Sequence, residues 1–334
     1  MKCTMRRGAQ IVLALIVVAA VLVSGGCSKS TGGATSSGGK DAATALIRVG
    51  TLQTDDLLPL WAAQDQGYFE GTNLKVEITT FQSAQEQVAA MTAGRIDAMM
   101  TDLVVPVQLT AAGTPVKAVT ICQTAPAGII AGKNSGITEL GQLAGVATGC
   151  SSPTAMEYIY DTALARAGVP AAQIKTTEIK KLPVRLQMLG EDKLKAAVLP
   201  WTLFALAQQQ GATPLLDQDQ AADLTSTVLV FSQKYLDSQD ADQHIASLLS
   251  QYNKAVDAIN ANPSNFRALL VEKAKLPEAI AQTYQVRQYP AVTLPDQKQV
   301  EDVITWMQKK AYIKEGQKSS TLIHEVKGAK YQKN

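Results

Sequence analysis

The sequence predicts an α/β fold with two lobes, each an open and mostly parallel sheet flanked by helices. Short segments with the two-residue period of strands alternate along the chain with segments of helical period. From Leu46 onward about 290 residues remain, and this length exceeds the size at which one hydrophobic core usually keeps growing. Two lobes therefore account for the length better than one.

The first alternating unit extends from Leu46 to Ala112. Apolar and charged residues alternate in the stretch LKVEI, as they do on a half-buried strand. Gly67 follows a helical segment and Ser83 precedes another, and these residue types favour helix ends and helix starts respectively. We expect strands over 46–50, 74–78 and 96–100, and helices over 59–68, 82–94 and from Asp102 to 112.

The second unit repeats this order of elements without repeating the sequence. We expect a strand over 145–148, a polar loop over 149–154, and a helix over 155–167 that Gly168 ends. A later strand over 195–199 leads into Pro200, Trp201 and Thr202. Because ligands of open α/β sheets bind at the carboxyl ends of strands, the loops that follow these strands hold the candidate binding residues.

The N-terminus has the pattern of a secretory signal, which we assign to residues 1–26. Cationic residues precede an apolar run over 11–23, and small residues then lead to Cys27. This order resembles the lipobox of bacterial lipoproteins, in which the cysteine becomes the lipidated first residue, although Ser24 stands where leucine is usual. The alternative is an uncleaved membrane anchor, but roughly 13 apolar residues are fewer than the ~20 that span a bilayer as a helix. Both interpretations place the folded chain outside the cytoplasm.

The segment after Cys27 is rich in Gly, Ser and Thr and has almost no large apolar side chains. Such a segment cannot bury enough surface to offset the loss of chain entropy. Residues 27–45 are therefore predicted to be a lipidated cysteine and a flexible tether, which attaches the lobes to the outer face of the cytoplasmic membrane.

The charge balance argues against nucleic acid as a partner. The formal net charge of the whole chain is +2, and loss of Lys2, Arg6 and Arg7 with the signal takes it to about −1. No cluster of Lys and Arg interleaved with aromatic residues occurs in the sequence.

Cysteines and histidines give little support for metal or covalent chemistry. Cys122 and Cys150 each end a strand-like run, so they either pair in an exported protein or remain two separate buried thiols. His244 and His324 each lie alone in a helical, surface-like context. The sequence therefore predicts no metal site, no Ser/His/Asp triad and no cofactor.

Four stretches, taken in order, resemble the solute-binding proteins of ABC importers, most of all the group for nitrate, sulfonates and thiamine precursors. They are GTLQTDDLLPLWAAQDQGYFEGTNLKVEI, FQSAQEQVAAMTAGRIDAMMTD, ITELGQLAGVATGCSSPTAMEYIYDTALARAGV and LKAAVLPWTLFALAQQQGA. The resemblance covers the chain from Leu46 to about Ile313. It implies a periplasmic-binding-protein-like fold of type II, in which two crossover strands join the lobes and the solute binds between them.

Carried onto this chain, the resemblance implies a first lobe from residues 46–127 and 228–334 and a second lobe from residues 128–227. The crossovers would lie near 128–130 and 227–229, which are both apolar and strand-like. A hinge built from strands lets the lobes close, and a solute that prefers the closed form shifts the balance toward it.

The resemblance also places polar residues of the first lobe at the cleft. The candidates are Thr54, Asp55, Asp56, Gln82, Ser83 and Asp102. At least one carboxylate is expected to accept hydrogen bonds from the solute, and several acidic groups suit an amine, amidine or aminopyrimidine better than a bare anion. The alternative is that Asp55 or Asp56 only caps the helix near Pro59, because carboxylates favour helix N-termini.

The second lobe contributes candidates with the opposite chemistry. Ser151, Ser152 and Thr154 precede a helix, where hydroxyl and free N–H groups suit an anionic or carbonyl oxygen; plain helix capping is the alternative. Trp201 stands where related proteins often carry glutamate, and it either stacks on a flat ring or cation or belongs to the core. In the C-terminal region Arg287 is expected on the surface, although contact with a solute carboxylate is an alternative.

The combined prediction is a monomeric, lipid-anchored, extracytoplasmic solute-binding component of an ABC importer. It would capture a small polar, nitrogen-containing solute and deliver it to a permease, with the energy supplied by separate ATPase subunits. It is not expected to be an enzyme. The alternative is an enzyme on the same fold related to pyrimidine synthesis for thiamine, which would need histidines or a reactive lysine near the cleft loops.

Overall fold

The computed structural model describes residues 44–332. The predicted signal, the lipidation at Cys27 and nearly all of the tether lie outside the described residues, and Ala45 already belongs to the first strand. None of the helices within 44–332 combines the length and the apolar character that a bilayer span needs.

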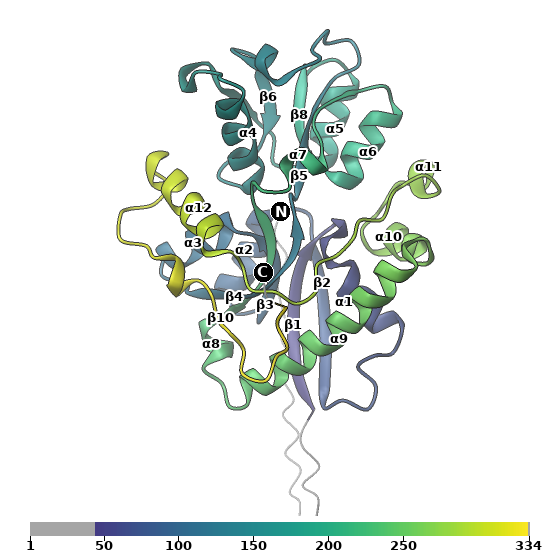
Figure 1. Cartoon of the computed structure of the whole chain (residues 1–334), viewed down its shortest axis with the longest axis vertical. Coiled ribbons are helices and arrows are strands. Elements are labelled where there is room, and N and C mark those ends of the chain that lie inside the picture. The colour runs from purple at the N-terminus through teal and green to yellow at the C-terminus, as the bar shows by residue number, and fades with distance from the viewer. Residues whose placement is uncertain (1–43, 333–334) are drawn as a thin grey trace, which may run out of the picture. The chain divides into compact units, whose positions relative to one another are not determined.

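Two five-stranded sheets form the centre of the described chain (Figure 1). Sheet A has the order β2 (Leu74–Phe81), β1 (Ala45–Leu52), β3 (Ala98–Asp102), β10 (Ser226–Ser232) and β4 (Val116–Thr124). Sheet B has the order β7 (Lys175–Glu178), β6 (Ala147–Cys150), β8 (Ala196–Pro200), β5 (Ala127–Ala131) and β9 (Thr213–Leu216). We call the parts built on sheets A and B the first and second lobe.

Both sheets are mixed, and the antiparallel strand marks where the chain changes sheet. In sheet A, β10 runs antiparallel to β3 and β4; in sheet B, β5 runs antiparallel to β8 and β9. The chain leaves sheet A after Thr124 and returns before Ser226, and the Ala125 N–H donates to the Thr225 carbonyl (2.8 Å) between the two crossing segments. The predicted crossovers, 128–130 and 227–229, lie just inside β5 and β10.

Helices cover both sheets, as Figure 1 shows. Those of the first lobe are α1 (Leu58–Asp65), α2 (Ala84–Thr92), α3 (Val104–Ala111), α8 (Gln233–Leu236), α9 (Ala241–Ala261), α10 (Arg267–Lys273), α11 (Glu278–Ala281) and α12 (Gln297–Lys309). Those of the second are α4 (Ala155–Arg166), α5 (Leu182–Gly190), α6 (Trp201–Gln209) and α7 (Gln218–Ala221). Short 3₁₀ turns cover Asp55–Leu57, Leu140–Leu143, Ala171–Gln173, Pro263–Phe266 and Ser319–Thr321.

Local chemistry explains where the predicted helices begin and end. Ser83 caps α2, because its Oγ accepts a hydrogen bond from the Glu86 N–H (3.3 Å), as predicted. The helix expected over 59–68 ends earlier, at Asp65. Gly67 adopts φ +67°, and the Tyr68 N–H turns back to the Ala63 carbonyl (2.9 Å), which closes the helix end.

The core consists of three apolar clusters. One joins one face of sheet A to α1, α9 and α10, and a second lies inside the second lobe. The third lies between sheet A, α3 and α12, and it also contains Ala155 and Tyr158 of α4. Because α4 belongs to the second lobe, apolar packing extends from one lobe to the other on this side.

The two cysteines of the described chain do not pair. Cys122 lies in β4 of sheet A and Cys150 ends β6 of sheet B, and both are buried free thiols. Of the two alternatives, that of two separate buried thiols is therefore correct.

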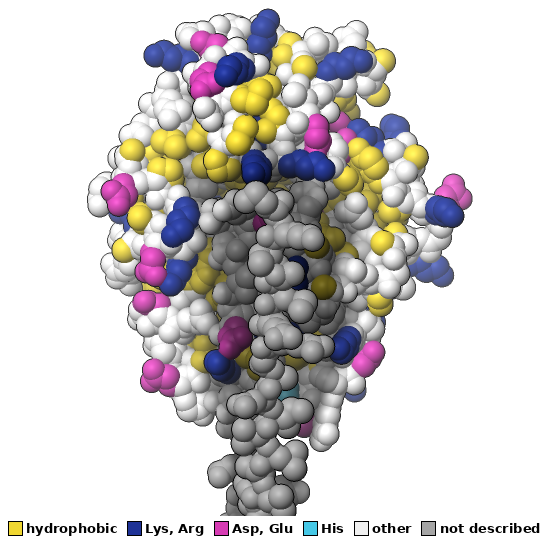
Figure 2. Space-filling view, turned by 180° about the vertical axis from the view of Figure 1, so that it is seen from behind, with side chains coloured by type: hydrophobic (Ala, Val, Ile, Leu, Met, Phe, Trp, Pro, Cys, Tyr) yellow, Lys and Arg dark blue, Asp and Glu magenta, His cyan; other side chains and the backbone are white. Residues whose placement is uncertain are grey.

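The surface carries charges of both signs. Figure 2 shows Lys and Arg side chains interspersed with Asp and Glu over the described part of the face that it presents. Such mixing of charges is typical of the surface of a globular domain.

Candidate functional site

The carboxyl ends of the parallel strands of both sheets face each other across the crossing segments, and polar residues gather there. Asp102, at the end of β3, holds the lobes together: one oxygen accepts from the N–H groups of Val104 (2.8 Å) and Val105 (3.2 Å), and the other accepts from Ala155 of α4 (3.2 Å). Burial raises the pKa of Asp102, and these N–H groups oppose the rise. The carboxylate thus sits at the N-terminus of a helix from the other lobe.

Asp55 is fixed by two tyrosines from the C-terminal region. Its Oδ2 accepts from the Tyr284 hydroxyl (2.8 Å) and its backbone carbonyl accepts from the Tyr289 hydroxyl (2.7 Å). Asp55 and Asp56 form the 3₁₀ turn before α1, and neither side chain caps that helix. The capping alternative for this pair is therefore wrong.

Asp56 is a buried carboxylate with an unusual protonation equilibrium. Only 8% of the residue is exposed, and its one hydrogen bond in the described structure comes from the Thr54 hydroxyl (3.2 Å). Burial, and then the charge of Asp55, raise the pKa of Asp56 to about 7, although the charge of Arg287 and the bond from Thr54 oppose the rise. The group can therefore accept or donate a hydrogen bond near neutral pH.

Arg287 lies beside this pair and not on the surface, so the surface role expected from the sequence is wrong. The residue is 5% exposed, and its Nη2 donates to the Thr124 carbonyl at the end of β4. Its Nε and Nη1 are buried and have no hydrogen-bond partner among the residues that the structure describes. Sequence reasoning favoured the surface over contact with a solute carboxylate because Arg in an irregular segment is usually exposed, and no local pattern reveals its distant neighbours.

Trp201 of the second lobe contacts both Arg287 and the first crossing segment. Its Nε1 donates to the Ala125 carbonyl in the first crossing segment, and its ring meets Phe204 edge-on (centroids 5.1 Å apart). The Arg287 guanidinium lies 5.5 Å from the ring centroid, within cation–π distance. A Cβ on Gly128 would come within 2.7 Å of the indole, so the residue packs directly on β5. Trp201 is thus both buried and in contact with a cation.

Hydrogen bonds from polar groups stabilise the loop before α4. Thr154 caps the helix, accepting from the Glu157 N–H (3.5 Å), and its hydroxyl donates to the Ser151 carbonyl (2.6 Å). The Ser152 N–H donates to the Glu178 carboxylate (3.0 Å). The capping alternative is correct for Thr154, while the Ala155 N–H at this helix start is taken by Asp102.

Two inter-lobe cavities flank the contact between α6 and α11, where the Gln209 amide donates to the Ala279 carbonyl (3.0 Å). The larger, about 560 Å³, is bounded by α6 and the segment that contains Arg287. The smaller, about 310 Å³, contains Gln82 and Thr202 with Lys181 and Lys275. Gln82 therefore lies at a different cavity from Arg287 and Trp201.

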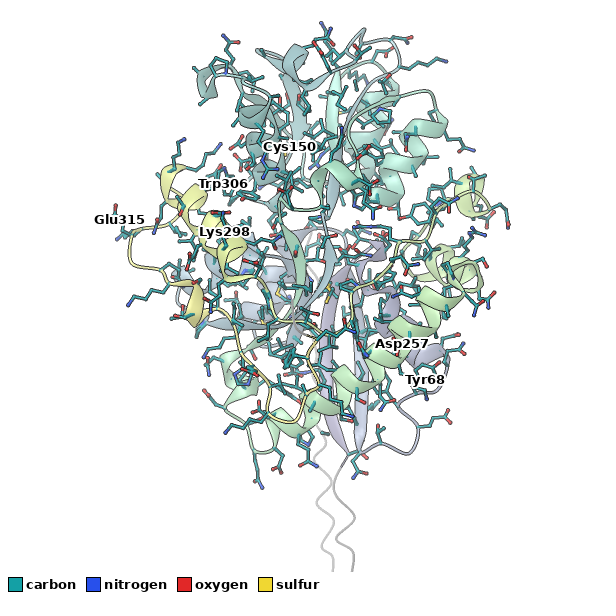
Figure 3. All side chains as sticks on the ribbon, viewed as in Figure 1. Tyr68, Cys150, Asp257, Lys298, Trp306 and Glu315 are labelled. Atoms are coloured by element: carbon teal, nitrogen blue, oxygen red, sulfur yellow. The ribbon has the colours of Figure 1, made fainter. Side chains whose placement is uncertain are left out.

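On the opposite side the lobes are held by a polar contact between α4 and the end of α12, which we call the α4–α12 contact. Lys310 bridges Glu157 (2.8 Å) and Asp161 (3.0 Å), and the Tyr312 hydroxyl donates to Glu157 (2.8 Å). The Trp306 indole donates to Asp161 (2.9 Å); Figure 3 labels Trp306 where α12 approaches the second lobe. Glu157 is nearly buried, so this contact contributes to the packing of the two lobes against each other.

Within residues 44–332 no group of three or more His, Cys, Asp or Glu side chains is placed to hold a metal ion. His324 lies away from the crossing segments, with its Nε2 2.7 Å from Asp242. The polar groups at the crossing segments offer hydrogen bonds and charge.

Residues 54–266 match the family model described as NMT1/THI5 like. This chain belongs to the NMT1/THI5-like family. The match covers more than half of the chain and includes the ligand-binding candidates from Thr54 to Trp201, whereas Arg287 and Cys27 lie outside it. No curated protein matches the sequence.

Solved structures share the fold of this family member at low sequence identity. The aliphatic sulphonate-binding protein SsuA of Escherichia coli matches with a TM-score of 0.72 and 16% identity, over 86% of this chain and 95% of that one. The alkanesulfonate-binding SsuA of Xanthomonas axonopodis pv. citri, bound to MOPS, gives 0.68 and 16%, over 85% and 96%. The nitrate-binding NrtA of Synechocystis PCC 6803 gives 0.69 and 14%, over 83% and 84%. The predicted periplasmic-binding-protein fold is confirmed.

Proposed function

We propose that this chain is the extracytoplasmic solute-binding component of an ABC importer, which captures a small polar solute between its lobes. The observation that carries the proposal is the meeting of buried polar groups from both lobes at the crossing segments. Arg287 of the first lobe lies beside Trp201 of the second, its charge acts on the buried Asp56, and two of its donors have no partner among the described residues. Residues of two lobes can close around a solute there with small changes at the crossing segments. The fold shared with sulfonate- and nitrate-binding proteins supports the same role.

The solute is proposed to be nitrogen-containing and to carry both donor and acceptor groups. Asp56, with a pKa near 7, accepts a hydrogen bond from an amine, amidine or aminopyrimidine when it is ionised. Trp201 offers an apolar ring for a flat or cationic part of the solute. Thr54 completes this part, because its hydroxyl orients the Asp56 carboxylate.

The other residues predicted from the sequence are proposed to line or to support the solute site. Asp102, Ser151, Ser152 and Thr154 surround the N-terminus of α4, where they are proposed to form the facing wall when the lobes close. Gln82 and Ser83 lie at the smaller cavity and the start of α2, and Asp55 holds the turn that presents Asp56.

The N-terminal sequence pattern supports a proposal for where the protein is located and which partners it serves. The mature protein is proposed to be a monomer, attached through lipid on Cys27 to the outer face of the cytoplasmic membrane. From there it would deliver solute to an ABC permease with its ATPase subunits. The alternative is an enzyme on the same fold. Cys150 does not favour it, because burial raises the pKa of this thiol to about 12 and keeps it protonated and a poor nucleophile.

The test is a thermal-shift screen of the soluble chain from Ser28 against amines, amino acids, aminopyrimidines, sulfonates and nitrate. A solute that binds only the folded state stabilises it by about 2.7 kcal/mol at a hundredfold excess over its Kd. At least one nitrogen-containing solute should raise the Tm, and Asp56→Asn should weaken the response. Asp257→Asn, at an exposed position labelled in Figure 3, is the matched control. A folded protein whose Tm no member of the panel changes would contradict the proposal.

A further inference from the structure

Arg287 is a buried cation whose hydrogen-bonding capacity is mostly unused. A guanidinium carries five N–H donors, and within residues 44–332 the only hydrogen bond of Arg287 is that from Nη2 to the Thr124 carbonyl. Nε and Nη1 are buried and have no partner in that part of the chain. Burying donors of a charged group without partners costs several kcal/mol, so a site of this kind calls for an acceptor.

The neighbouring carboxylates do not supply that acceptor. Asp55 is taken by Tyr284, and Asp56 is bonded to Thr54. None of the ion pairs among the described residues includes Arg287, although its charge acts on Asp56 from nearby. The cation is therefore close to negative charge but makes no direct bond with it.

Space for a partner lies next to Arg287. The residue lines the inter-lobe cavity of about 560 Å³, together with the aromatic side chains of Trp201, Phe204 and Tyr284 and the amide of Gln208. Drug-sized and smaller ligands fit cavities of this size, and apolar walls with a few polar groups are typical of their sites. A guanidinium at such a wall matches the planar geometry of an oxyanion.

We propose that Arg287 is the anion-binding residue of the solute site and that it holds a carboxylate or sulfonate group of the solute. The inference rests on the proposed solute-binding function and makes it more specific: the solute is a zwitterion, with its oxyanion on Arg287 and its nitrogen-containing part toward Asp56. Trp201, which contacts the guanidinium, covers the body of the solute.

Arg287 also connects the proposed solute position to the hinge. Its Nη2 donates to the carbonyl of Thr124, the last residue of β4 before the chain crosses to the second lobe. The Trp201 indole donates to Ala125 in that crossing segment. An oxyanion on the guanidinium would therefore fix residues of both lobes at the crossing point, which favours the closed arrangement.

The test compares acids with their neutral amides. The Tm of the soluble chain is measured at constant ionic strength with acetate against acetamide, and with methanesulfonate against methanesulfonamide. We expect at least one acid, and neither amide, to raise the wild-type Tm saturably. Arg287→Lys should weaken the apparent affinity at least tenfold, because it keeps the charge and loses the planar fork, and Arg287→Gln should abolish the response. Arg166→Gln, which removes an exposed arginine paired with Asp223, should respond like wild type.

Loss of Arg287 removes the positive charge beside Asp55 and Asp56. The double variant Asp56→Asn/Arg287→Gln is therefore tested in parallel, because it removes one negative charge together with the positive one and so keeps the buried charge balanced and the chain folded. The inference is overturned if an amide acts as well as its acid, if either Arg287→Gln chain keeps the response, or if neither acid shifts wild type. Equal binding of a neutral or cationic solute by wild type and Arg287→Gln would overturn the inference and leave the proposed function standing. Oxyanion binding through Arg287, without stimulation of the partner transporter's ATPase in proteoliposomes, would support the inference and contradict the importer role.

Discussion

Asp56 should make the stability of this protein depend on pH in a direction opposite to that of most carboxylates. Its pKa is raised from the ordinary 3.8 to about 7, so between these values the folded chain holds a proton that the unfolded chain has lost. The contribution of Asp56 is fully present below pH 3.8 and is lost as the pH rises through about 7. At 1.36 kcal/mol for each pKa unit, the free energy of unfolding should fall by about 4 kcal/mol across this window.

The measurement is urea denaturation at intervals between pH 4 and 8, for wild type and Asp56→Asn. Asparagine cannot ionise, so the difference between the two free energies of unfolding isolates the titration of position 56 and should change by several kcal/mol. Asp257→Asn, at an exposed site, should differ from wild type by a nearly constant amount. A wild-type minus Asp56→Asn difference that stays flat from pH 4 to 8 would refute the assignment of a buried, partly protonated carboxyl.

Three further substitutions test the packing around the site, each by urea denaturation at pH 7. Lys310→Met should cost about 1–2 kcal/mol, because Glu157 is nearly buried and loses one of its partners. Lys298→Met, in an exposed pair, should change the stability much less, and equal effects of the two substitutions would contradict the α4–α12 contact. Gly128→Ala should cost about 1–3 kcal/mol and weaken solute binding, because its Cβ would meet the indole at 2.7 Å; unchanged stability would show that the site has room. Gln87→Leu should cost about 1–3 kcal/mol, because the amide donates to carbonyls of both β1 and β3 (3.0 and 2.7 Å); a neutral result would mean that these carbonyls find other donors.

The elements that the sequence predicted are those whose signal is local. Strand alternation located β1, β2 and β3, and the small polar residues Ser83 and Thr154 marked the starts of α2 and α4, because a cap acts on N–H groups within its own turn. Bounds moved by a few residues where pairing decided them: β2 continues to Phe81 because β1 pairs with it to Leu52.

The site was predicted only in part, because its decisive contacts are distant in the chain. Tyr284 and Tyr289 bond Asp55 across 229 and 234 positions, and Arg287 meets Thr124 across 163. No period or spacing records such a contact. Polarity therefore favoured a surface position for Arg287 and left a helix cap as the alternative for Asp55, and only the fold shows both within one buried cluster.

The position of β10 has a consequence for the order in which the protein can fold. Sheet A places this strand between β3 and β4, but its residues follow the whole second lobe in the chain. A polypeptide that emerges N-terminus first can complete sheet B as soon as β9 has emerged, while β3 and β4 still lack the strand that joins them. Until residue 232 has arrived, both present unpaired edges that are open to wrong partners. The first lobe is thus the last to complete its sheet, although it begins the sequence. A chain that ends before β10 would have a complete sheet B, but in sheet A the strands β2, β1 and β3 would remain separate from β4.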